Sequence, residues 1–342
     1  MNLITGATGL VGAHVALQLL QQNKSVVAIK RNGSDVSKTK KLFSYYTSDA
    51  DNLFNKITWL DADVCDIYSL LDALEGIETV YHCAGFVSFN SNDHKQMHRI
   101  NSEGTANMVN ACLEKNIKAL CYVSSIATLQ NPDITKNIDE SVYWKSSPTA
   151  SDYAISKYNG EREVWRGIEE GLNAVIVNPG IILGPGFWNQ SSGKLIKTTF
   201  KGNPFYTNGS SATIDAKDVA ACMIQLVENK QFSQRFVLIE NNYSFKEILT
   251  QLHKALGKKE PTIEAGKILL TIGKWFDGIR SFISGKEQLI TQETITAGLD
   301  KNSYNNNRVK LALNYQFIPL QETVKFVCAA YLNDIQKGSK YN

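Results

Sequence analysis

The sequence predicts the α/β fold class: a doubly wound parallel sheet, followed by a smaller and mostly helical part. Short apolar strands alternate with amphipathic helices through about residue 180, which is typical of a parallel sheet with helices on both faces. The strands show almost no alternation of apolar and polar residues, as expected where both faces of a sheet are buried. A glycine-rich turn joins the first expected strand to the first expected helix.

Apolar runs of strand length define the expected sheet, and helical spacing of apolar residues defines the helices between the strands. Strands are expected at residues 1–6, 25–31, 56–64, 78–85, 119–127, 173–180 and 235–240. Helices are expected at residues 10–23, 68–76, 103–116 and 150–171. Beyond about residue 180 glycine-rich loops interrupt the alternation, and the C-terminal region has the pattern of helices with polar loops.

Composition excludes several classes of protein. The 342 residues are 43% hydrophobic and 20% charged, with a net charge of +3, which is an ordinary globular mixture. So small a positive charge gives no reason to expect a nucleic-acid partner. The 6 cysteines form no C-x-x-C pair and the 5 histidines are scattered, so we expect reduced thiols and no metal site.

The chain opens directly on an apolar strand, so we expect no secretion signal. It contains no apolar run long enough for a transmembrane helix. Both observations predict a cytoplasmic protein.

Three glycines stand between the first strand and the first helix, in the sequence T-G-A-T-G-L-V-G. Gly6 would permit the tight turn, Gly9 would let the backbone approach a pyrophosphate, and Gly12 would let the helix pack close to the sheet. The free N–H groups and the dipole of a helix N-terminus favour an anion at this place. The alternative is a purely structural turn.

Five further motifs follow the glycines. They are DADVCD at 61–66, HCAG at 82–85, VSSIAT at 123–128, YAISK at 153–157 and NPGIILGPG at 178–186. With the G-x-x-G-x-x-G spacing they resemble the short-chain dehydrogenase/reductase superfamily, in its extended branch of NAD-dependent epimerases, dehydratases and reductases. They stand in the family's order and cover about the first 190 residues, and the remainder offers little to match.

The resemblance implies a Rossmann fold that binds NAD(P). Residues 1–180 would form this domain, with a returning strand near 212–240, and residues 181–211 and 241–342 would form the substrate-binding part. Asp63 and Val64 would lie beside the adenine. The candidate cofactor-binding residues, from these motifs and from the end of the second strand, are Gly6, Thr8, Gly9, Leu10, Val11, Gly12, Lys30, Arg31, Asp63, Val64, Ala84, Gly85, Lys157, Pro179, Gly180 and Ile182.

Tyr153 and Lys157 are four residues apart on an expected helix, so both side chains leave the same face. A free tyrosine, with a pKa near ~10, is a poor base at neutral pH, and a lysine ammonium beside it would lower that pKa. Tyr153 would then give a proton to a carbonyl oxygen as hydride arrives, or take it back. The alternative is an ordinary pair on a helix surface.

A hydroxyl should polarise the same carbonyl. The family pattern assigns this role to Ser125, while Ser124 and Thr128 remain open, because only one of two successive serines on a strand faces a given side. The family also uses an asparagine on the preceding helix to order the site, which corresponds to Asn101. An asparagine that caps a helix start is the alternative interpretation of Asn101.

The end of the second strand predicts the choice of cofactor. NAD-binding sites commonly place an acid there to hold the ribose 2′-hydroxyl, whereas Lys30 and Arg31 stand there in this sequence. A guanidinium can bind a 2′-phosphate bidentately, so we predict a preference for NADP(H), with Lys38 as a further cation. In the alternative, NAD(H) is bound, both cations are solvated and Asp35 reaches the ribose.

The motifs also bear on the reaction. Dehydratases of this branch usually carry an acidic pair directly after a threonine in the serine segment, which SSIATLQNPD lacks. Epimerases usually carry an arginine where Asn178 stands, and Asn178 is similar to the residue of dihydroflavonol reductases, cinnamoyl-CoA reductases and 3β-hydroxysteroid dehydrogenases. The resemblance therefore implies a reductase that passes hydride from NADPH to a ketone or aldehyde of a fairly apolar small molecule, or oxidises the alcohol.

Two alternatives to a reductase remain. One is an epimerase of a nucleotide sugar with tightly bound NAD. The other is a dinucleotide-binding sensor without turnover, against which the intact Tyr153–Lys157 pair argues. Many relatives are dimers in which the helix that carries Tyr153 forms a four-helix contact, so the resemblance also implies a homodimer.

Residues 266–286 have the pattern of an amphipathic helix with a basic bias. Its apolar residues are Ile268, Ile272, Trp275, Ile279 and Phe282, and the charged residues on its other faces are Lys267, Lys274, Asp277 and Arg280. We expect this helix to pack its apolar side on the substrate-binding part. A lid over an apolar pocket and attachment to a membrane surface are the alternatives. Phe187 and Trp188 are candidates for the wall of such a pocket, or ordinary core aromatics.

Overall fold

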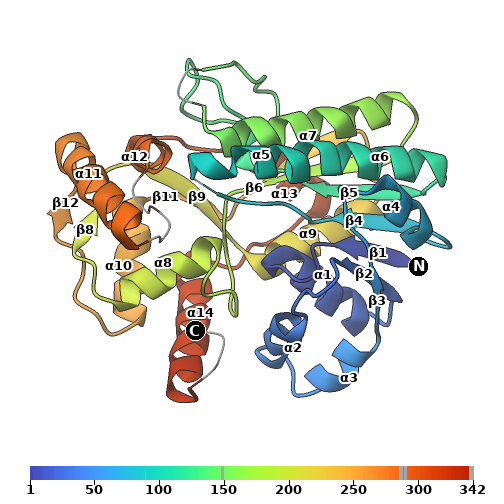
Figure 1. Cartoon of the computed structure of the whole chain (residues 1–342), viewed down its shortest axis with the longest axis horizontal. Coiled ribbons are helices and arrows are strands. Elements are labelled where there is room, and N and C mark those ends of the chain that lie inside the picture. Colours follow the sequence, from blue (N-terminus) through green and yellow to red (C-terminus); the bar gives the residue numbers. More distant parts are fainter. Residues whose placement is uncertain (89, 148–149, 285–287, 289–290, 339–342) are drawn as a thin grey trace.

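A seven-stranded sheet forms the centre of the molecule, and all of its strand pairs are parallel (Figure 1). The computed structural model describes residues 1–88, 90–147, 150–284, 288 and 291–338. The strands lie in the order β10-β6-β5-β4-β1-β2-β3. Their bounds are β1 Asn2–Thr5, β2 Val26–Lys30, β3 Ile57–Asp61, β4 Thr79–His82, β5 Ala119–Val123, β6 Ala174–Pro179 and β10 Gln234–Leu238. The predicted doubly wound parallel sheet is confirmed.

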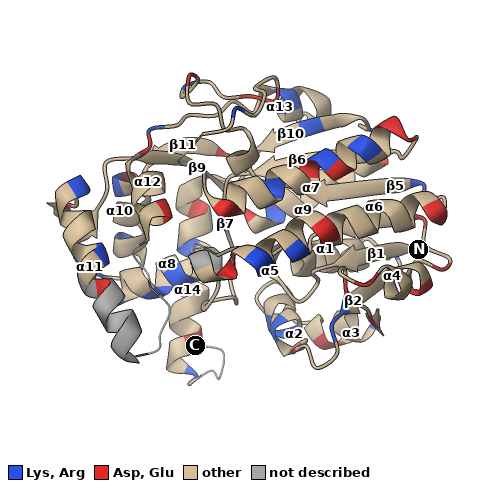
Figure 2. Cartoon of the chain, turned by 45° about the horizontal axis from the view of Figure 1, so that its top comes forward, with Lys and Arg blue, Asp and Glu red and all other residues tan. Residues whose placement is uncertain are grey.

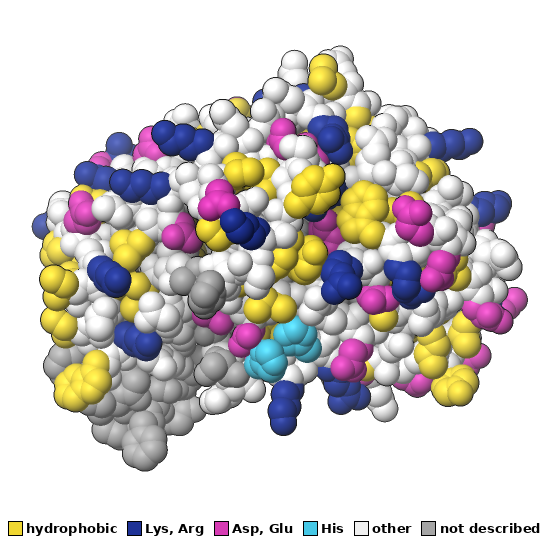
Figure 3. Space-filling view, turned by 90° about the horizontal axis from the view of Figure 1, so that it is seen from above, with side chains coloured by type: hydrophobic (Ala, Val, Ile, Leu, Met, Phe, Trp, Pro, Cys, Tyr) yellow, Lys and Arg dark blue, Asp and Glu magenta, His cyan; other side chains and the backbone are white. Residues whose placement is uncertain are grey.

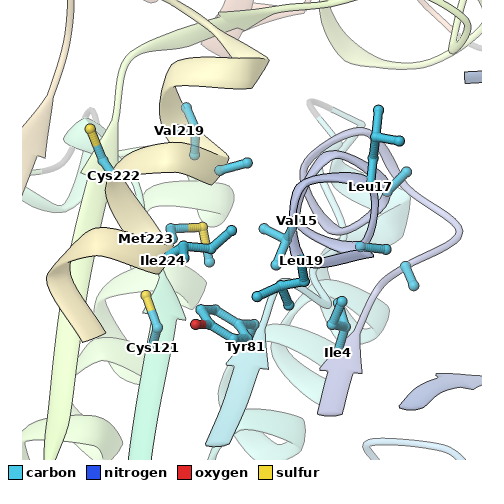
Figure 4. Close-up of a cluster of buried hydrophobic side chains, with 14 of the residues drawn as sticks. Ile4, Val15, Leu17, Leu19, Tyr81, Cys121, Val219, Cys222, Met223 and Ile224 are labelled. Atoms are coloured by element: carbon cyan, nitrogen blue, oxygen red, sulfur yellow. The ribbon is translucent and has the colours of Figure 1, made fainter. Parts of the chain in front are cut away.

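Helices cover both faces of this sheet (Figure 1). One face carries α1 (Leu10–Gln21), α2 (Ser37–Ser44), α3 (Ala50–Asn55) and α9 (Ala216–Glu228), and the other carries α4 (Ile67–Ala73), α6 (Gly104–Glu114) and α7 (Asp152–Glu169). Val15 and Leu19 of α1 point toward Met223 of α9 and Tyr81 of β4 (Figure 4). Because a fully buried aliphatic side chain contributes about 1.5–3 kcal/mol, this apolar layer fixes the helices on the sheet.

The carboxyl ends of the parallel strands meet at one edge of the sheet. The strand order reverses at β1, since the chain goes from β1 to β2 on one side and later returns to β4 on the other. Ile4 of β1 accordingly lies between Ala28 of β2 and Tyr81 of β4. Open α/β sheets bind ligands outside the carboxyl ends of the strands at such a reversal.

The chain after β6 builds a smaller part beside the sheet. It contains the strands β7 Ile181–Leu183, β8 Phe205–Tyr206, β9 Ser210–Asp215, β11 Asn241–Ser244 and β12 Ile263–Glu264, and the helices α8 Ser191–Phe200, α10 Phe245–Ala255, α11 Lys267–Ser284, α12 Gln292–Leu299, α13 Asn307–Leu313 and α14 Leu320–Gln336. Phe187 and Trp188 are 5% and 0% exposed within apolar clusters, so they are core aromatics.

Three local features differ from the expected elements. The helices α2 and α3 fill the stretch between β2 and β3, where none was expected because few of their residues are apolar. Strand β5 ends at Val123, and Ile126–Thr128 form a 3₁₀ turn in place of the expected end of the strand. The helix expected from residue 103 begins earlier, because α5 (His94–His98) and a π-helical turn run directly into α6.

The apolar side of helix α11 does not face the direction that was expected. Ile268, Ile272 and Trp275 are exposed to solvent, so the expectation that this side packs on the substrate-binding part is wrong for these residues. Helical periodicity shows which side chains share a face, and it does not show what that face meets. The side chains of Ile279, Arg280 and Phe282 lie outside the described ones.

The surface carries charges of both signs. Lys and Arg stand among Asp and Glu along α7 and elsewhere (Figure 2). On α7, Arg166 pairs with Glu163 and Glu170, each at 2.8 Å. All six cysteines are free thiols, and four of them are buried. Within the described residues, no group of His, Cys, Asp and Glu could hold a metal, and no helix is long and apolar enough to cross a membrane.

Candidate active site

The turn between β1 and α1 has a backbone that requires glycine. Gly6 has a φ of +66°, and a Cβ there would lie 2.7 Å from the backbone of Cys83 and Ala84. A Cβ on Gly12 would lie 2.4 Å from the carbonyl oxygen of Gly6, so the first turn of α1 packs directly on this backbone. A side chain at either position would therefore push the turn away from β4 or from α1.

The N-terminus of α1 can receive an anion. Gly9 is the N-cap, has an extended backbone and makes no side-chain cap, and the first turn of the helix holds no acidic residue. The N–H groups of this turn and the positive end of the helix dipole therefore favour a negatively charged group. Thr8, Leu10 and Val11 are half-buried around the turn. This cradle fits the pyrophosphate of a dinucleotide.

The two cations at the end of β2 have different surroundings. Lys30 forms an ion pair with Asp61, which ends the neighbouring strand β3. Arg31 is exposed, and within the described part of the chain its side chain has no hydrogen bond or ion pair. Arg31 is therefore the cation of this pair that can turn to a ligand without breaking an existing contact.

Asp35 is held within its own loop. Its carboxylate accepts hydrogen bonds from the hydroxyl and from the backbone N–H of Ser37, and these bonds keep the pKa of Asp35 below its usual range. The charge of Lys38 acts in the same direction. The Asp35 carboxylate is thus engaged at the start of α2.

The residues expected beside an adenine follow β3. The Asp63 carboxylate accepts a hydrogen bond from the backbone N–H of Cys65 at 2.9 Å, and the Asp63 N–H donates to Ser69 Oγ at 3.1 Å. Val64 is buried against α6, where a Cβ on Gly104 would lie 2.8 Å from its side chain. Asp63 therefore shapes its loop, and Val64 seats that loop on α6.

The other residues expected at the cofactor follow β4 and β6 at the same edge. Ala84 is half-buried and its N–H donates to the Thr5 hydroxyl at 2.9 Å. Gly85 is exposed, and a Cβ there would lie 3.9 Å from Lys157 Nζ. Pro179 ends β6 and is buried, while Gly180 and Ile182, which were also expected at the cofactor, are half-buried.

Ser125 and Tyr153 meet where β5 ends and α7 begins. Their side chains form a hydrogen bond. Ser124 points elsewhere, since its hydroxyl donates to Glu161 at 2.6 Å, and Thr128 donates to the same carboxylate at 2.8 Å. Of the three hydroxyls that the sequence left open, the structure brings Ser125 to Tyr153.

Lys157 is buried, which contradicts the alternative of an ordinary surface pair on α7. Its Nζ donates to the carbonyl oxygen of Val123 at 2.6 Å and lies 4.4 Å from the centre of the Tyr122 ring. Burial lowers the pKa of Lys157 to about 7, although the nearby Glu161 raises it. Lys157 can therefore gain or lose a proton near neutral pH.

The pKa of Tyr153 differs from the expectation. Burial raises the pKa of its phenol above the ordinary value, and the hydrogen bond with Ser125 offsets only part of this effect. The sequence predicted that Lys157 would lower this pKa. The cost of taking the phenolate out of water therefore dominates the pKa of Tyr153.

Asn101 lies inside a helical run, in the π-helical turn Arg99–Glu103, so the alternative of a cap at a helix start is wrong. Its carbonyl accepts a hydrogen bond from the Phe86 N–H at 2.8 Å, and its amide donates to the Phe86 carbonyl at 2.9 Å and to Ser156 Oγ at 3.0 Å. Asn101 thus fastens the loop after β4 to α7, beside Lys157. Turns of this kind are frequent at functional sites.

Comparison with known proteins identifies the family. Residues 2–238 match the NAD dependent epimerase/dehydratase family. The chain belongs to this family. It is 27% identical over 267 residues to sterol demethylase protein B of Methylococcus capsulatus, which covers 77% of this chain and 76% of that protein. It is also 28% identical to cinnamoyl-CoA reductase 1 of Petunia hybrida over 250 residues, and this match covers 70% of this chain and 72% of that protein.

Among solved structures, that of gox2253 is similar to this chain with a TM-score of 0.79 and 25% identity, over 97% of this chain and 98% of the other. The fold and the family together make this chain an NAD(P)-dependent enzyme of the extended short-chain dehydrogenase/reductase type, as the motifs predicted.

Behind the serine segment of this epimerase/dehydratase-family chain lies a buried carboxylate that the sequence reasoning missed. Glu161 is 1% exposed. Its Oε2 accepts hydrogen bonds from Ser124, Thr128 and Asn178 at 2.6, 2.8 and 2.9 Å. Its Oε1 pairs with Arg235 Nη1 at 2.9 Å. The residues on both sides of Ser125 are thus tied to one carboxylate on α7.

The sequence contained a local signal for Glu161 but none for its partner Arg235. Glu161 follows Lys157 by four residues, so it lies on the same face of α7 and could have been singled out. Arg235 lies on β10, and no motif marks it. Asn178 was noted for its likeness to reductases, and the structure places its amide on Glu161.

A second buried network joins the glycine turn to Asn101 through His82. The Ala84 N–H donates to Thr5 Oγ1, which lies 2.7 Å from His82 Nδ1, while His82 Nε2 lies 3.2 Å from Thr105 Oγ1. The Thr105 hydroxyl donates its proton to the backbone carbonyl of Asn101, so Nε2 carries the imidazole proton and Nδ1 accepts from Thr5. Burial lowers the pKa of His82 to about 3, so the ring is neutral.

Proposed function

We propose that this chain is an NADP(H)-dependent reductase that converts a ketone or aldehyde of a fairly apolar small molecule to the alcohol, or the reverse. The observation that carries the proposal is the contact of Ser125 with Tyr153 beside buried Lys157, at the edge of the sheet that also holds the glycine cradle. The cradle would hold the pyrophosphate, and the bound nicotinamide would supply or accept the hydride.

Tyr153 would provide the proton that the substrate oxygen needs. Because burial keeps its pKa above the ordinary value, the phenol is protonated at neutral pH and can donate to a carbonyl oxygen that becomes negative. Ser125, in hydrogen-bonding contact with Tyr153, would donate a second hydrogen bond to the same oxygen. Lys157, with a pKa of about 7, would return a proton to this site at neutral pH.

The preference for NADP(H) rests on Arg31. Lys30 is paired with Asp61, and Asp35 is bound to Ser37, so neither of these charges is available without breaking a contact. A planar, exposed guanidinium can bind a phosphate bidentately, whereas a ribose hydroxyl would be better held by an acid.

The substrate class rests on the relatives named as a cinnamoyl-CoA reductase and a sterol demethylase protein. We assign cofactor binding to residues 1–180 together with β10, and substrate binding to residues 181–211 and 241–342.

The first test is a fluorescence titration of the purified chain with NADPH and NADH. The expected result is tighter binding of NADPH, and Arg31→Asp should weaken NADPH binding by about tenfold or more with little effect on NADH. Arg162→Asp, a change at an exposed arginine on α7, is the matched control. A wild-type preference for NADH would contradict the assignment of Arg31.

The second test separates a reductase from an epimerase. Tyr153→Phe should keep NADPH binding and lose NADPH-dependent reduction of apolar aldehydes and ketones. A reductase must exchange its cofactor in each turnover, so the nicotinamide should dissociate freely. A tightly retained NAD that does not exchange would contradict the reductase and indicate an epimerase, which returns the hydride to its own substrate.

A further inference from the structure

One side of α11 presents apolar side chains to solvent. Ile268 is 80% exposed, Ile272 50% and Trp275 65%. These residues stand at positions i, i+4 and i+7, so they form one stripe along the helix. Leu269 beside the stripe is 41% exposed. Monomeric proteins rarely expose large contiguous apolar patches to water.

A second element extends this patch. Phe205 of β8 and Ile263 of β12 are paired in register, and they are 40% and 44% exposed. The chain passes from β12 to α11 through Ala265, whose N–H donates to the carbonyl of Tyr206 at 2.7 Å. Hydrophobic side chains accordingly lie along the left-hand edge of the molecule in Figure 3, the end at which Figure 1 places β8, β12 and α11.

In the sequence of residues 266–286, the charged residues are mainly positive. Residues 266–286 contain four basic residues and one acid, which are Lys267, Lys274, Arg280, Lys286 and Asp277. Lys267 is exposed and Lys274 half-buried beside the stripe. In a symmetric contact between two copies of this chain, the same patch would face itself and these like charges would meet. An anionic surface would attract them.

We propose that this edge of the molecule docks on the surface of a membrane that contains anionic phospholipids, with α11 lying in the plane of the interface. An apolar stripe with an amphipathic tryptophan would enter the boundary between headgroups and acyl chains, while the basic residues would meet lipid phosphates. The helix lies on the bilayer and does not cross it, in agreement with the absence of a membrane-crossing helix among the described residues.

The docked edge adjoins the proposed catalytic site. Lys274 Nζ lies 3.3 Å from Gln292 Oε1 at the start of α12, and the next residue, Glu293, accepts a hydrogen bond from the Asp152 N–H at 3.2 Å. Asp152 precedes Tyr153 on α7. An apolar substrate dissolved in the lipid would therefore enter beside α11 and α12, an extension that rests on the proposed function.

Vesicle sedimentation tests the docking. The full chain should bind vesicles of equal parts phosphatidylglycerol and phosphatidylcholine, bind phosphatidylcholine alone weakly, and be released by high salt. Ile272→Asp should weaken binding to the anionic vesicles by about tenfold or more. Leu311→Asp, at an 86% exposed leucine on α13, should bind like the wild type. Brominated acyl chains should quench less fluorescence in Trp275→Phe than in the wild type.

Either of two vesicle results would overturn the proposal: no binding of the wild type to anionic vesicles, or equal binding by Ile272→Asp. A dimer in analytical ultracentrifugation that Ile272→Asp dissociates, without vesicle binding, would also overturn it and assign the stripe to a second copy. Because Ile272 is exposed, Ile272→Asp should fold normally and keep wild-type reduction of a water-soluble aldehyde. That readout separates failure of the docking from failure of the proposed reductase function.

Discussion

Replacing Arg235 with methionine should lower the free energy of unfolding by about 3 kcal/mol, because it removes the cation from a buried carboxylate. The Arg235 guanidinium donates to Glu161 Oε1 at 2.9 Å, to the Glu140 carbonyl at 3.0 Å and to the Val142 carbonyl at 2.6 Å. The side chain of Arg235 is 11% exposed and that of Glu161 2%. Water therefore has little room to take over these contacts.

The magnitude follows from what remains after the substitution. Removal of one partner from a buried ion pair typically costs about 3–5 kcal/mol. Ser124, Thr128 and Asn178 still donate to Glu161, which holds the cost near the lower end. The two carbonyls that lose a donor add to the loss, and the apolar packing of methionine offsets part of it.

Urea unfolding, followed by tryptophan fluorescence and circular dichroism, measures this change if both probes report one transition. Arg166→Met is the matched control on α7: its ion pairs are on the surface and its side chain is 36% exposed, so about 0–1 kcal/mol is expected. The double variant Glu161→Leu/Arg235→Met should lose about 1–3 kcal/mol less than the sum of the single variants. The reasoning is refuted if Arg235→Met is as stable as Arg166→Met. It is also refuted if the stability losses of Glu161→Leu and Arg235→Met add up to that of the double variant.

Three further predictions concern the site. Ser125→Ala should lower kcat by about a hundredfold. Ser124→Ala loses a hydrogen bond to a buried carboxylate, so it should mainly lower the free energy of unfolding, by about 1–2 kcal/mol. Steady-state kinetics and urea unfolding measure the two effects, and equal kcat values for the two variants would contradict the assignment of Ser125. Gly12→Ala should abolish NADPH binding in a fluorescence titration, because its Cβ would lie 2.4 Å from a backbone oxygen, while Gly266→Ala, with nothing within 4 Å, should bind normally. Lys157 has a folded-state pKa of about 7, whereas its ordinary pKa is 10.5. Between these two values the folded protein binds fewer protons than the unfolded one, so stability rises with pH. The cost of burying the Lys157 ammonium is fully present below the folded-state pKa. Lys157→Met should lack the rise in stability between pH 7 and 10.5 when unfolding is measured at several pH values. Parallel pH dependences of the variant and the wild type would contradict this prediction.

Local patterns in the sequence determined most of the central sheet. Apolar runs and helical spacing placed β1, α1, β5 and α7 within a few residues of their observed bounds, because such patterns depend on near neighbours in the chain. The glycine turn was predictable for the same reason, since the positive φ of Gly6 and the tight packing of Gly12 are properties of one short segment. Tyr153 and Lys157 were recognisable from their spacing on one helix.

Only the tertiary structure decided the contacts between distant segments. Arg235 pairs with Glu161 across 74 residues, and no local pattern records such a pair. The choice of Ser125 over Ser124 depends on where β5 ends and on how α7 lies against it.

The same limit explains the two expectations that failed at Tyr153 and α11. Four-residue spacing places Lys157 near Tyr153, but the pKa of each depends on how much water the whole fold excludes from it. The stripe at 268–275 has the same periodicity whether it meets the core or solvent. Sequence periodicity determined which side chains share a face, and the packing of the whole chain decided what that face meets.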